Sequence, residues 1–182
     1  MRTDIKITYE HYSALPEGPP HYQLIDGDLT LSPSPNFHHQ ELIGTLYFEL
    51  RAFNTQHKLG VVALAPLDVV LSDVDVLQPD ILFVANARKK IIRKEGVFGA
   101  PDLCIEILSP SNRKLDLGIK RQLYARHGVI EYWIVDPDDN TVSVYRLQEE
   151  TEQPRAKLDD RATLTSALLP GFELKLERLF AK

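Results

Sequence analysis

The chain has 182 residues, of which 43% are hydrophobic and 26% charged, proportions that suit one globular domain with a sizeable core. We see no apolar stretch long enough to span a bilayer and no signal peptide, so we expect a cytoplasmic protein that does not contact a membrane. A single cysteine, Cys104, excludes an internal disulfide, and its apolar neighbours predict a buried, reduced thiol.

The net charge of −5 at first argues against nucleic acid, but the charge is unevenly distributed. Residues 85–127 contain ten Lys or Arg and four Asp or Glu, which gives +6. The remaining residues carry 11 basic and 22 acidic side chains, or −11. A basic segment of this kind is what a polyanionic substrate requires. The alternative is an ordinary solvated surface rich in lysine and arginine.

The N-terminal part predicts a short helix, a hairpin and a long helix. Thr8–Leu15 fits a helix that is capped by Thr8 and ends before Pro16. Residues 22–31 predict a hairpin, because Asp26-Gly27 is a strong signal for a tight turn. Apolar positions from Leu42 to Phe53 recur at helical spacing, which indicates one long helix with a core-facing side.

Strands dominate the rest of the chain. The predicted strands cover 61–71, 80–85, 103–108, 131–135 and 141–147, with a short helix or excursion over 88–94, a polar connection over 148–161, and a short strand within the closing segment 168–180. Leu115, Ile119 and Leu123 repeat every four residues, which indicates a helix with these side chains toward the core. This order predicts a mixed α/β domain with helices on both faces of a central sheet.

Two acidic residues stand within or next to apolar runs. Asp80 follows Pro79 at the head of one run, and Glu106 lies inside the run 103–108. A charge in such a place is costly unless it is paired, so these two carboxylates predict a shared divalent ion at the ends of adjacent strands. Asp68 is a third such acid, either a ligand or a group behind the ligands. Capping of strand ends is the alternative for Asp80 and Asp68.

The helix after Ser111 carries a polar stripe, because Asp116, Lys120 and Tyr124 are spaced by four residues. This stripe is expected at the border of the buried face, from which Lys120 reaches toward the end of the Glu106 strand. A lysine beside a metal ion can position a hydroxide or stabilise the transition state. The alternative is a simple helical ion pair between Asp116 and Lys120.

Other side chains are expected to support the site. His39, at the start of the long helix, is expected either to hydrogen-bond a site acid or contact phosphate, or only to cap the helix or lie exposed. Arg113, Lys114 and Arg121 lie in the basic segment and are candidates for nucleic-acid contact. The chain contains no CxxC, HExxH, phosphate-loop or GxSxG motif, so nothing indicates a zinc site, a nucleotide-binding loop or a serine hydrolase.

In this set of motifs the chain resembles the Uma-two family, a restriction-endonuclease domain of the PD-(D/E)XK nuclease superfamily. The matching stretches are 22–29 (YQLIDGDL), 39–40 (HQ), 78–84 (QPDILFV), 99–111 (GAPDLCIEILSPS), 116–126 (DLGIKRQLYAR), 131–137 (EYWIVDP) and 169–172 (LPGF). Each stretch alone is weak, but the ordered set is specific, and it runs from about residue 8 to residue 180.

The resemblance implies one restriction-endonuclease-like domain over residues 1–182, which cleaves DNA with Mg²⁺ or Mn²⁺ and pairs as a homodimer. It implies that Asp80 is the first acid of the motif and Glu106 the second. The usual lysine would lie two residues after Glu106, where this chain has Leu108, and Lys120 is the natural substitute. Gln23 stands where the family commonly has glutamate, a change that removes a metal ligand or a hydrogen-bonding acid.

Three functions therefore stay open. The first is a Mg²⁺-dependent DNA endonuclease that uses Asp80, Glu106 and Lys120. The second is a nucleic-acid-binding or regulatory module with a decayed site, which the departures at Gln23 and Leu108 suggest. The third is an interaction domain without a nucleic-acid role, which the negative net charge suggests. The sequence specifies neither the target sequence, nor DNA against RNA, nor single against double strands.

Overall fold

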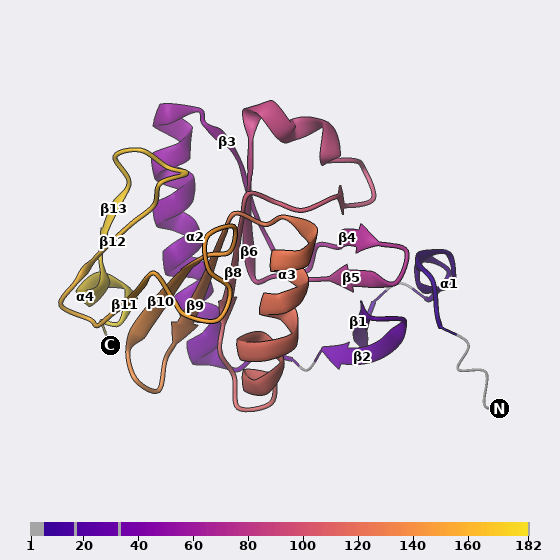
Figure 1. Ribbon diagram of the computed structural model, residues 1–182. Helices are drawn as coiled ribbons and strands as arrows, with labels where there is room; N and C mark the ends of the chain where they lie inside the picture. The colour runs from indigo at the N-terminus through magenta and orange to yellow at the C-terminus, as the bar shows by residue number, and fades with distance from the viewer. Residues whose placement is uncertain (1–5, 17, 33, 182) are drawn as a thin grey trace.

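A computed structural model describes residues 6–16, 18–32 and 34–181. Its strands form a six-stranded central sheet in the order β11-β10-β9-β8-β6-β3, a five-stranded sheet in the order β2-β1-β5-β4-β7, and the pair β12-β13. The five-stranded sheet and α1 (Tyr9–Ser13) lie on one side of the central sheet, as Figure 1 shows. The mixed α/β class is as predicted, but the strands expected in one sheet are divided between two.

The N-terminal hairpin agrees with the sequence. Strands β1 (His21–Ile25) and β2 (Asp28–Ser32) pair antiparallel, with Ile25 opposite Asp28. Asp26 and Gly27 form the turn with φ values of 49° and 82°, the left-handed conformation that a two-residue hairpin turn requires. Three short strands complete this sheet: β4 (Val69–Ser72), β5 (Asp75–Leu77) and β7 (Val97–Phe98).

The single strand expected over 61–71 is two strands in different sheets. Strand β3 (Gly60–Leu64) ends the central sheet, and β4 begins at Val69 in the smaller one. Pro66 lies between them and has no N–H to continue a ladder of hydrogen bonds. The chain therefore crosses from one sheet to the other at this point.

The central sheet contains both parallel and antiparallel pairs. Its other strands are β6 (Ile81–Ala85), β8 (Leu103–Ile107), β9 (Glu131–Asp136), β10 (Thr141–Arg146) and β11 (Ala156–Leu158). Strand β6 runs antiparallel to β8, whereas β8 and β9 run parallel. Strand β11 lies within the segment expected to be a polar connection, and it pairs with β10 through Val142 and Leu158.

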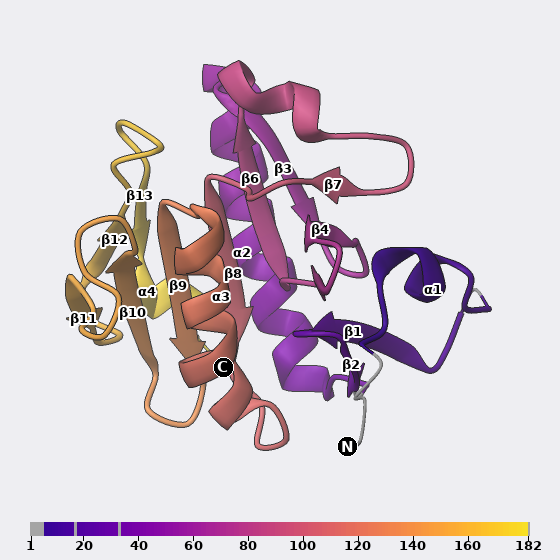
Figure 2. The ribbon, with the colours of Figure 1, turned by 45° about the vertical axis from the view of Figure 1, so that its right-hand side comes forward.

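Helices cover both faces of the central sheet, as predicted. On one face lies α2 (Phe37–His57), whose Leu46 and Leu50 belong to a core with Phe83, Ile105 and Trp133. On the other face lie a π-helix, η2 (Leu115–Lys120), and α3 (Arg121–His127), which continues it. Figure 2 shows α2 and α3 with the sheet between them.

The remaining elements extend the core. The 3₁₀-helix η1 (Asn86–Ile91) follows β6. Strands β12 (Thr163–Thr165) and β13 (Glu173–Lys175) and helix α4 (Leu176–Leu179) contribute buried side chains to the α2 side of the core. Among the helices of the described residues, none combines the length and apolar character needed to cross a membrane.

Candidate functional site

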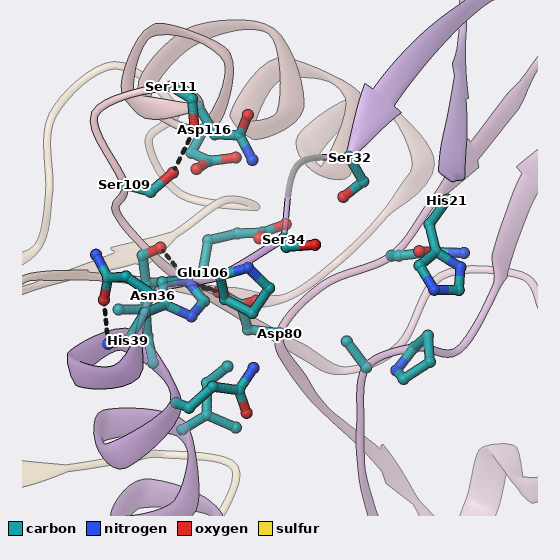
Figure 3. A pocket seen from close by; sticks show the side chains of 18 of the residues that line it. His21, Ser32, Ser34, Asn36, His39, Asp80, Glu106, Ser109, Ser111 and Asp116 are labelled. Carbon is teal, nitrogen blue, oxygen red and sulfur yellow. Dashed lines mark hydrogen bonds and ion pairs between the residues drawn. The ribbon is translucent and has the colours of Figure 1, made fainter. Parts of the chain in front are cut away.

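A cavity of about 460 Å³ opens where the two larger sheets meet. Figure 3 shows His21 on one side of it and Asn36 and His39 on the other, with Asp80 and Glu106 between them. Its lining includes side chains from β1, the N-terminal end of α2, the residues before β6, the end of β8 and η2, together with residues of β2, β3 and the connecting loops. Segments that are far apart in the sequence therefore share one polar space.

Asp80 and Glu106 meet because β6 begins where β8 ends. Ile81 lies opposite Ile105 in the antiparallel ladder, so Asp80, one residue earlier, lies beside the last residues of β8. The N–H of Ile107 donates to Oδ2 of Asp80 at 2.7 Å. Both carboxylates line the cavity, the arrangement that two acids at the ends of adjacent strands predict.

Glu106 is buried, and its two oxygens have different surroundings. Oε1 accepts hydrogen bonds from Nζ of Lys120 at 3.0 Å and from the hydroxyl of Tyr124 at 2.9 Å. Within the described parts of the chain, no group donates to Oε2, and Oδ1 of Asp80 likewise has no donor. Burial raises the pKa of Glu106 to about 8, against the opposing effect of the Lys120 ammonium. One oxygen of each acid is thus left for a ligand.

Lys120 is only 2% exposed and lies between two acids. Besides Glu106, its Nζ lies 2.9 Å from Oδ1 of Asp116, a close ionic contact without the alignment of a hydrogen bond. Burial alone would lower the pKa of Lys120, but the carboxylates of Glu106 and Asp116 outweigh it and raise this pKa above its ordinary value. Burial also raises the pKa of Asp116. The lysine therefore stays charged.

His39 holds Asp80 from the opposite side. Oδ1 of Asn36, the cap of α2, accepts from the backbone N–H of His39 at 2.8 Å. The ring Nε2 lies 2.9 Å from the carbonyl oxygen of Ile107, which can only accept, so Nε2 carries the proton. The same Nε2 lies 3.4 Å from Oδ2 of Asp80. Burial lowers the pKa of His39, but contact with Asp80 raises it more.

The helix that carries Lys120 has a different buried side from the one expected. Asp116, Lys120 and Tyr124 are fully buried rather than at the border, and Ile119 is 50% exposed rather than in the core. The π-helical turn is wider than an α-helical turn, which shifts the side chains around the axis. The polar stripe is buried without prohibitive cost because Glu106 supplies its partner.

Gln23 and Asp68 have different relations to the cavity. Gln23 is buried and lines it, and its Oε1 accepts from the N–H of Gln78 at 3.1 Å. Asp68 is not among the residues that line this cavity, and its Oδ1 accepts from the Tyr12 hydroxyl at 2.9 Å and from Nε2 of Gln78 at 2.7 Å. Gln78 lines the cavity and contacts Asp68, so Asp68 lies behind Gln78. This position matches the expected alternative of a group behind the ligands, and not that of a ligand.

The basic residues proposed for nucleic-acid contact differ in what they contact. Arg113 pairs with Asp136, with Nη1 3.1 Å from Oδ1. Lys114 is exposed. Arg121 is buried, which corrects the expectation for this residue: its guanidinium lies over the ring of Tyr145 at 5.2 Å and reaches Glu152 at 2.7 Å. These partners lie 24 and 31 residues away, so no local signal revealed them.

Several lining residues were missed from the sequence. They include Ser34, Asn36, Ser109, Ser111 and Asn112, which form two loops next to the acids, as Figure 3 shows for most of them. A signal for them exists, since the tripeptide Ser-Pro-Ser occurs at 32–34 and again at 109–111. Both copies precede a helix that contributes to the site.

The donors present fit a hard divalent cation. Within residues 6–16, 18–32 and 34–181, no three His, Cys, Asp or Glu side chains are grouped so as to hold a metal ion. Mg²⁺, however, usually takes only one or two carboxylates and completes its shell with water and substrate phosphate. The free oxygens of Asp80 and Glu106, facing one cavity, match that requirement.

Comparisons with known proteins agree with this geometry. The family model Uma2, described as "Putative restriction endonuclease", matches residues 9–177. The structure is similar to the crystal structure of "a putative nuclease belonging to DUF820" from Anabaena variabilis ATCC 29413, with a TM-score of 0.82 and 25% sequence identity over 96% of this chain and 98% of that chain. No curated protein matches the chain.

Proposed function

The chain belongs to the Uma2 family, and from this membership and the geometry of the cavity we propose that it is a metal-dependent endonuclease that hydrolyses phosphodiester bonds of DNA. One observation carries the proposal: Asp80 and Glu106 each leave one oxygen without a donor at the same cavity, and a buried lysine contacts Glu106. The use of DNA and of a metal ion both belong to the proposal.

In this proposal Asp80 and Glu106 hold Mg²⁺ or Mn²⁺. The ion, when bound, lowers the pKa of water and neutralises charge that grows on the phosphate. The residues of the chain prepare the place for it: His39 and the Ile107 N–H fix Oδ2 of Asp80, which aims the other oxygen at the cavity. Because Glu106 has a raised pKa, it must release its proton before it can act as a ligand.

Lys120 supplies a second positive charge. Its raised pKa keeps the ammonium charged at neutral pH, and Asp116 holds it against Glu106 from a position one helical turn away. A fixed cation beside the reacting phosphate stabilises the negative charge that develops in the transition state. Lys120 thus takes the role of the lysine that a strand position usually supplies, and Leu108 packs in the core instead.

The test is cleavage of plasmid and single-stranded DNA in Mg²⁺, in Mn²⁺ and in EDTA. We expect cleavage only with a divalent cation, and a loss of about 10²–10³-fold in Asp80→Asn and in Lys120→Met. Lys157→Met, at an exposed lysine of β11, is the matched control and should cleave like the wild type. Cleavage in EDTA, or cleavage that persists in Asp80→Asn, would contradict the proposed site.

A second candidate function is DNA binding without cleavage. The identity of Gln23 favours it, since an amide lines the cavity where a third carboxylate would strengthen the grip on a cation. In that case the wild type would bind DNA and cleave none with any cation, and Asp80→Asn would bind as well as the wild type.

A further inference from the structure

A second hollow of about 590 Å³ adjoins the cavity and has no role in the proposed hydrolysis. It is lined by α1, by the start of β1, by Asp68, and by Leu15, Pro16, Gly18 and Pro20. His21 and Gln78 line both the cavity and the hollow. Figure 2 shows α1 beside β1 on the outer side of the smaller sheet. A chain-like ligand with one group in the cavity can therefore extend into the hollow.

Three tyrosines, Tyr9, Tyr12 and Tyr22, line this hollow. Tyr12 is part of the core, and its hydroxyl oxygen lies 2.9 Å from both the carbonyl oxygen of Tyr22 and Oδ1 of Asp68, to either of which its single proton can be donated. Tyr9 is held by the edge of Phe98 at 5.5 Å, yet Tyr9 and Tyr22 remain only half-buried. Core packing thus accounts for Tyr12. The rings of Tyr9 and Tyr22 pack against the core only in part, and both line the hollow.

The polar groups of the hollow suit a neutral ligand that donates hydrogen bonds. Oδ1 of Asp68 is occupied by Tyr12 and Gln78, whereas no described residue donates to its Oδ2. Among the described residues, the charged ones that line the hollow are Asp68, Glu95 and Lys94, two acids and one base. This balance disfavours a phosphate group. A carboxylate beside aromatic rings is instead suited to the amino group of a nucleobase stacked on tyrosine.

We propose that the tyrosine-lined hollow binds an unpaired nucleobase of the DNA strand whose phosphate occupies the cavity. The inference rests on the proposed function, and it names the substrate class: single-stranded or locally unpaired DNA. A base must leave its stack to enter a hollow, and that step costs least where the base is not paired. Asp68 favours a base with an exocyclic amino group, so cytosine binds better than thymine, which has none.

The experiment measures binding separately from cleavage. Fluorescence anisotropy in Mg²⁺ buffer compares oligo-dC, oligo-dT and a duplex of equal length, all in the Asp80→Asn background. We expect single-stranded oligo-dC to bind at least about tenfold more tightly than the duplex. Combining Tyr9→Ala and Tyr22→Ala in one variant should weaken oligo-dC binding by about tenfold or more. Phe48→Ala, at an exposed aromatic residue of α2 outside the hollow, should change nothing.

Asp68→Asn provides a milder test that does not remove an aromatic ring. It should abolish the preference for oligo-dC over oligo-dT, because the open carboxylate oxygen is no longer a fixed acceptor. Circular dichroism checks the fold of each variant, and Asp68→Asn decides the matter if the tyrosine variants unfold. Equal affinity for single strands and duplex, unchanged affinity in the folded tyrosine variants, or no measurable binding would overturn the proposal.

The two proposals fail in different ways. Base-dependent binding in Asp80→Asn, together with a wild type that never cleaves, would overturn the nuclease and retain the hollow as a base-binding site. Metal-dependent cleavage of duplex and single strands at equal rates, with no effect of Asp68→Asn, would retain the nuclease and overturn the hollow.

Discussion

Two buried glutamates on neighbouring parallel strands show how the same residue serves the fold in one place and the site in another. Glu106 of β8 is 3% exposed and Glu131 of β9 is 1% exposed. Oε2 of Glu131 accepts from the Trp133 indole at 3.1 Å and from Ser166 at 2.8 Å, and Oε1 accepts from the N–H of Ala167 at 3.1 Å. Both oxygens of Glu131 are occupied by neutral donors.

Glu106 also accepts two hydrogen bonds, from Lys120 and from Tyr124, but both donors contact the same oxygen, Oε1. Its other oxygen is left at the cavity, and the nearby cation is shared with Asp116. A buried carboxylate whose oxygens are all satisfied ties segments together, as Glu131 ties the residues after β12 to the sheet. A buried carboxylate with a free oxygen is instead available to a ligand. Four changes test this distinction.

The largest effect is expected from Glu106→Gln on activity. An amide is a poor ligand for Mg²⁺ compared with a carboxylate, so cleavage should fall by about 10²–10³-fold. Stability should not fall, because the raised pKa leaves Glu106 uncharged at neutral pH without a cation, and Lys120 remains paired with Asp116. Plasmid nicking and urea unfolding of the same preparation measure both. A variant that keeps its activity but unfolds more readily would show that Glu106 is structural.

Glu131→Gln should have the opposite result. The amide nitrogen that replaces one oxygen faces donors instead of accepting from them, so the free energy of unfolding should fall by about 1–3 kcal/mol. The specific activity of the folded fraction should be unchanged. Urea unfolding monitored by Trp133 fluorescence reports the loss directly. Reduced activity at full stability would refute the structural assignment of Glu131.

The pH dependence of stability should separate the two acids further. Without a divalent cation, the pKa of Glu106 is about 8 in the folded state against an ordinary value of 4.5. The stability that follows from this raised pKa is complete below about pH 4.5 and is lost as the pH rises toward 8. The unfolding free energy of the wild type, relative to Glu106→Gln, should therefore fall between these pH values.

Mg²⁺ should reduce that fall, because the cation replaces the proton on Glu106. Urea titrations at several pH values, with Mg²⁺ and with EDTA, provide the comparison. Parallel curves for the wild type and Glu106→Gln in EDTA would mean that Glu106 has an ordinary pKa.

The smallest effect is expected from Gln23→Glu. The new carboxylate can still accept from the N–H of Gln78, and it adds a negative charge to the cavity. The Mg²⁺ concentration for half-maximal cleavage should fall several-fold, as expected for an added charge near the ion at intermediate dielectric. Cleavage measured across a Mg²⁺ titration tests this. A requirement for more Mg²⁺ than the wild type needs would place Gln23 outside the metal site.

Local patterns in the sequence were enough to locate the acids and the main helices. Asp80 and Glu106 were detectable because a charge at the end of or inside an apolar run demands a partner, and α2 because its apolar positions recur at helical spacing. The register of β6 and β8 then brings the acids together. The four-residue spacing of Asp116, Lys120 and Tyr124 drew attention to Lys120, and the resemblance added that it substitutes for the lysine usually found at the position of Leu108.

Long-range pairing was not detectable in the same way. Hydrophobic periodicity does not say which sheet a strand joins, so the crossing at Pro66 and the pairing of β11 with β10 were missed. The burial of Arg121 depends on Tyr145 and Glu152, which are distant in sequence. Glu131 was read as an ordinary strand residue because its donors, Ser166 and Ala167, come from the C-terminal segment.

The number of residues in the π-helix η2 determines the angle around the helix axis at which Asp116 stands relative to Lys120. In a uniform α-helix, residues four apart drift by about 40° around the axis, and the wider turn of η2 reduces that drift between Asp116 and Lys120. Deleting Leu117 would put Asp116 and Lys120 three residues apart instead of four and rotate Asp116 by about 100° around the axis relative to α3. Asp116 would then contact Lys120 from a three-residue spacing and at a changed angle, although no charged residue had been lost. Segment length, as much as residue identity, keeps this cation in register with its acids.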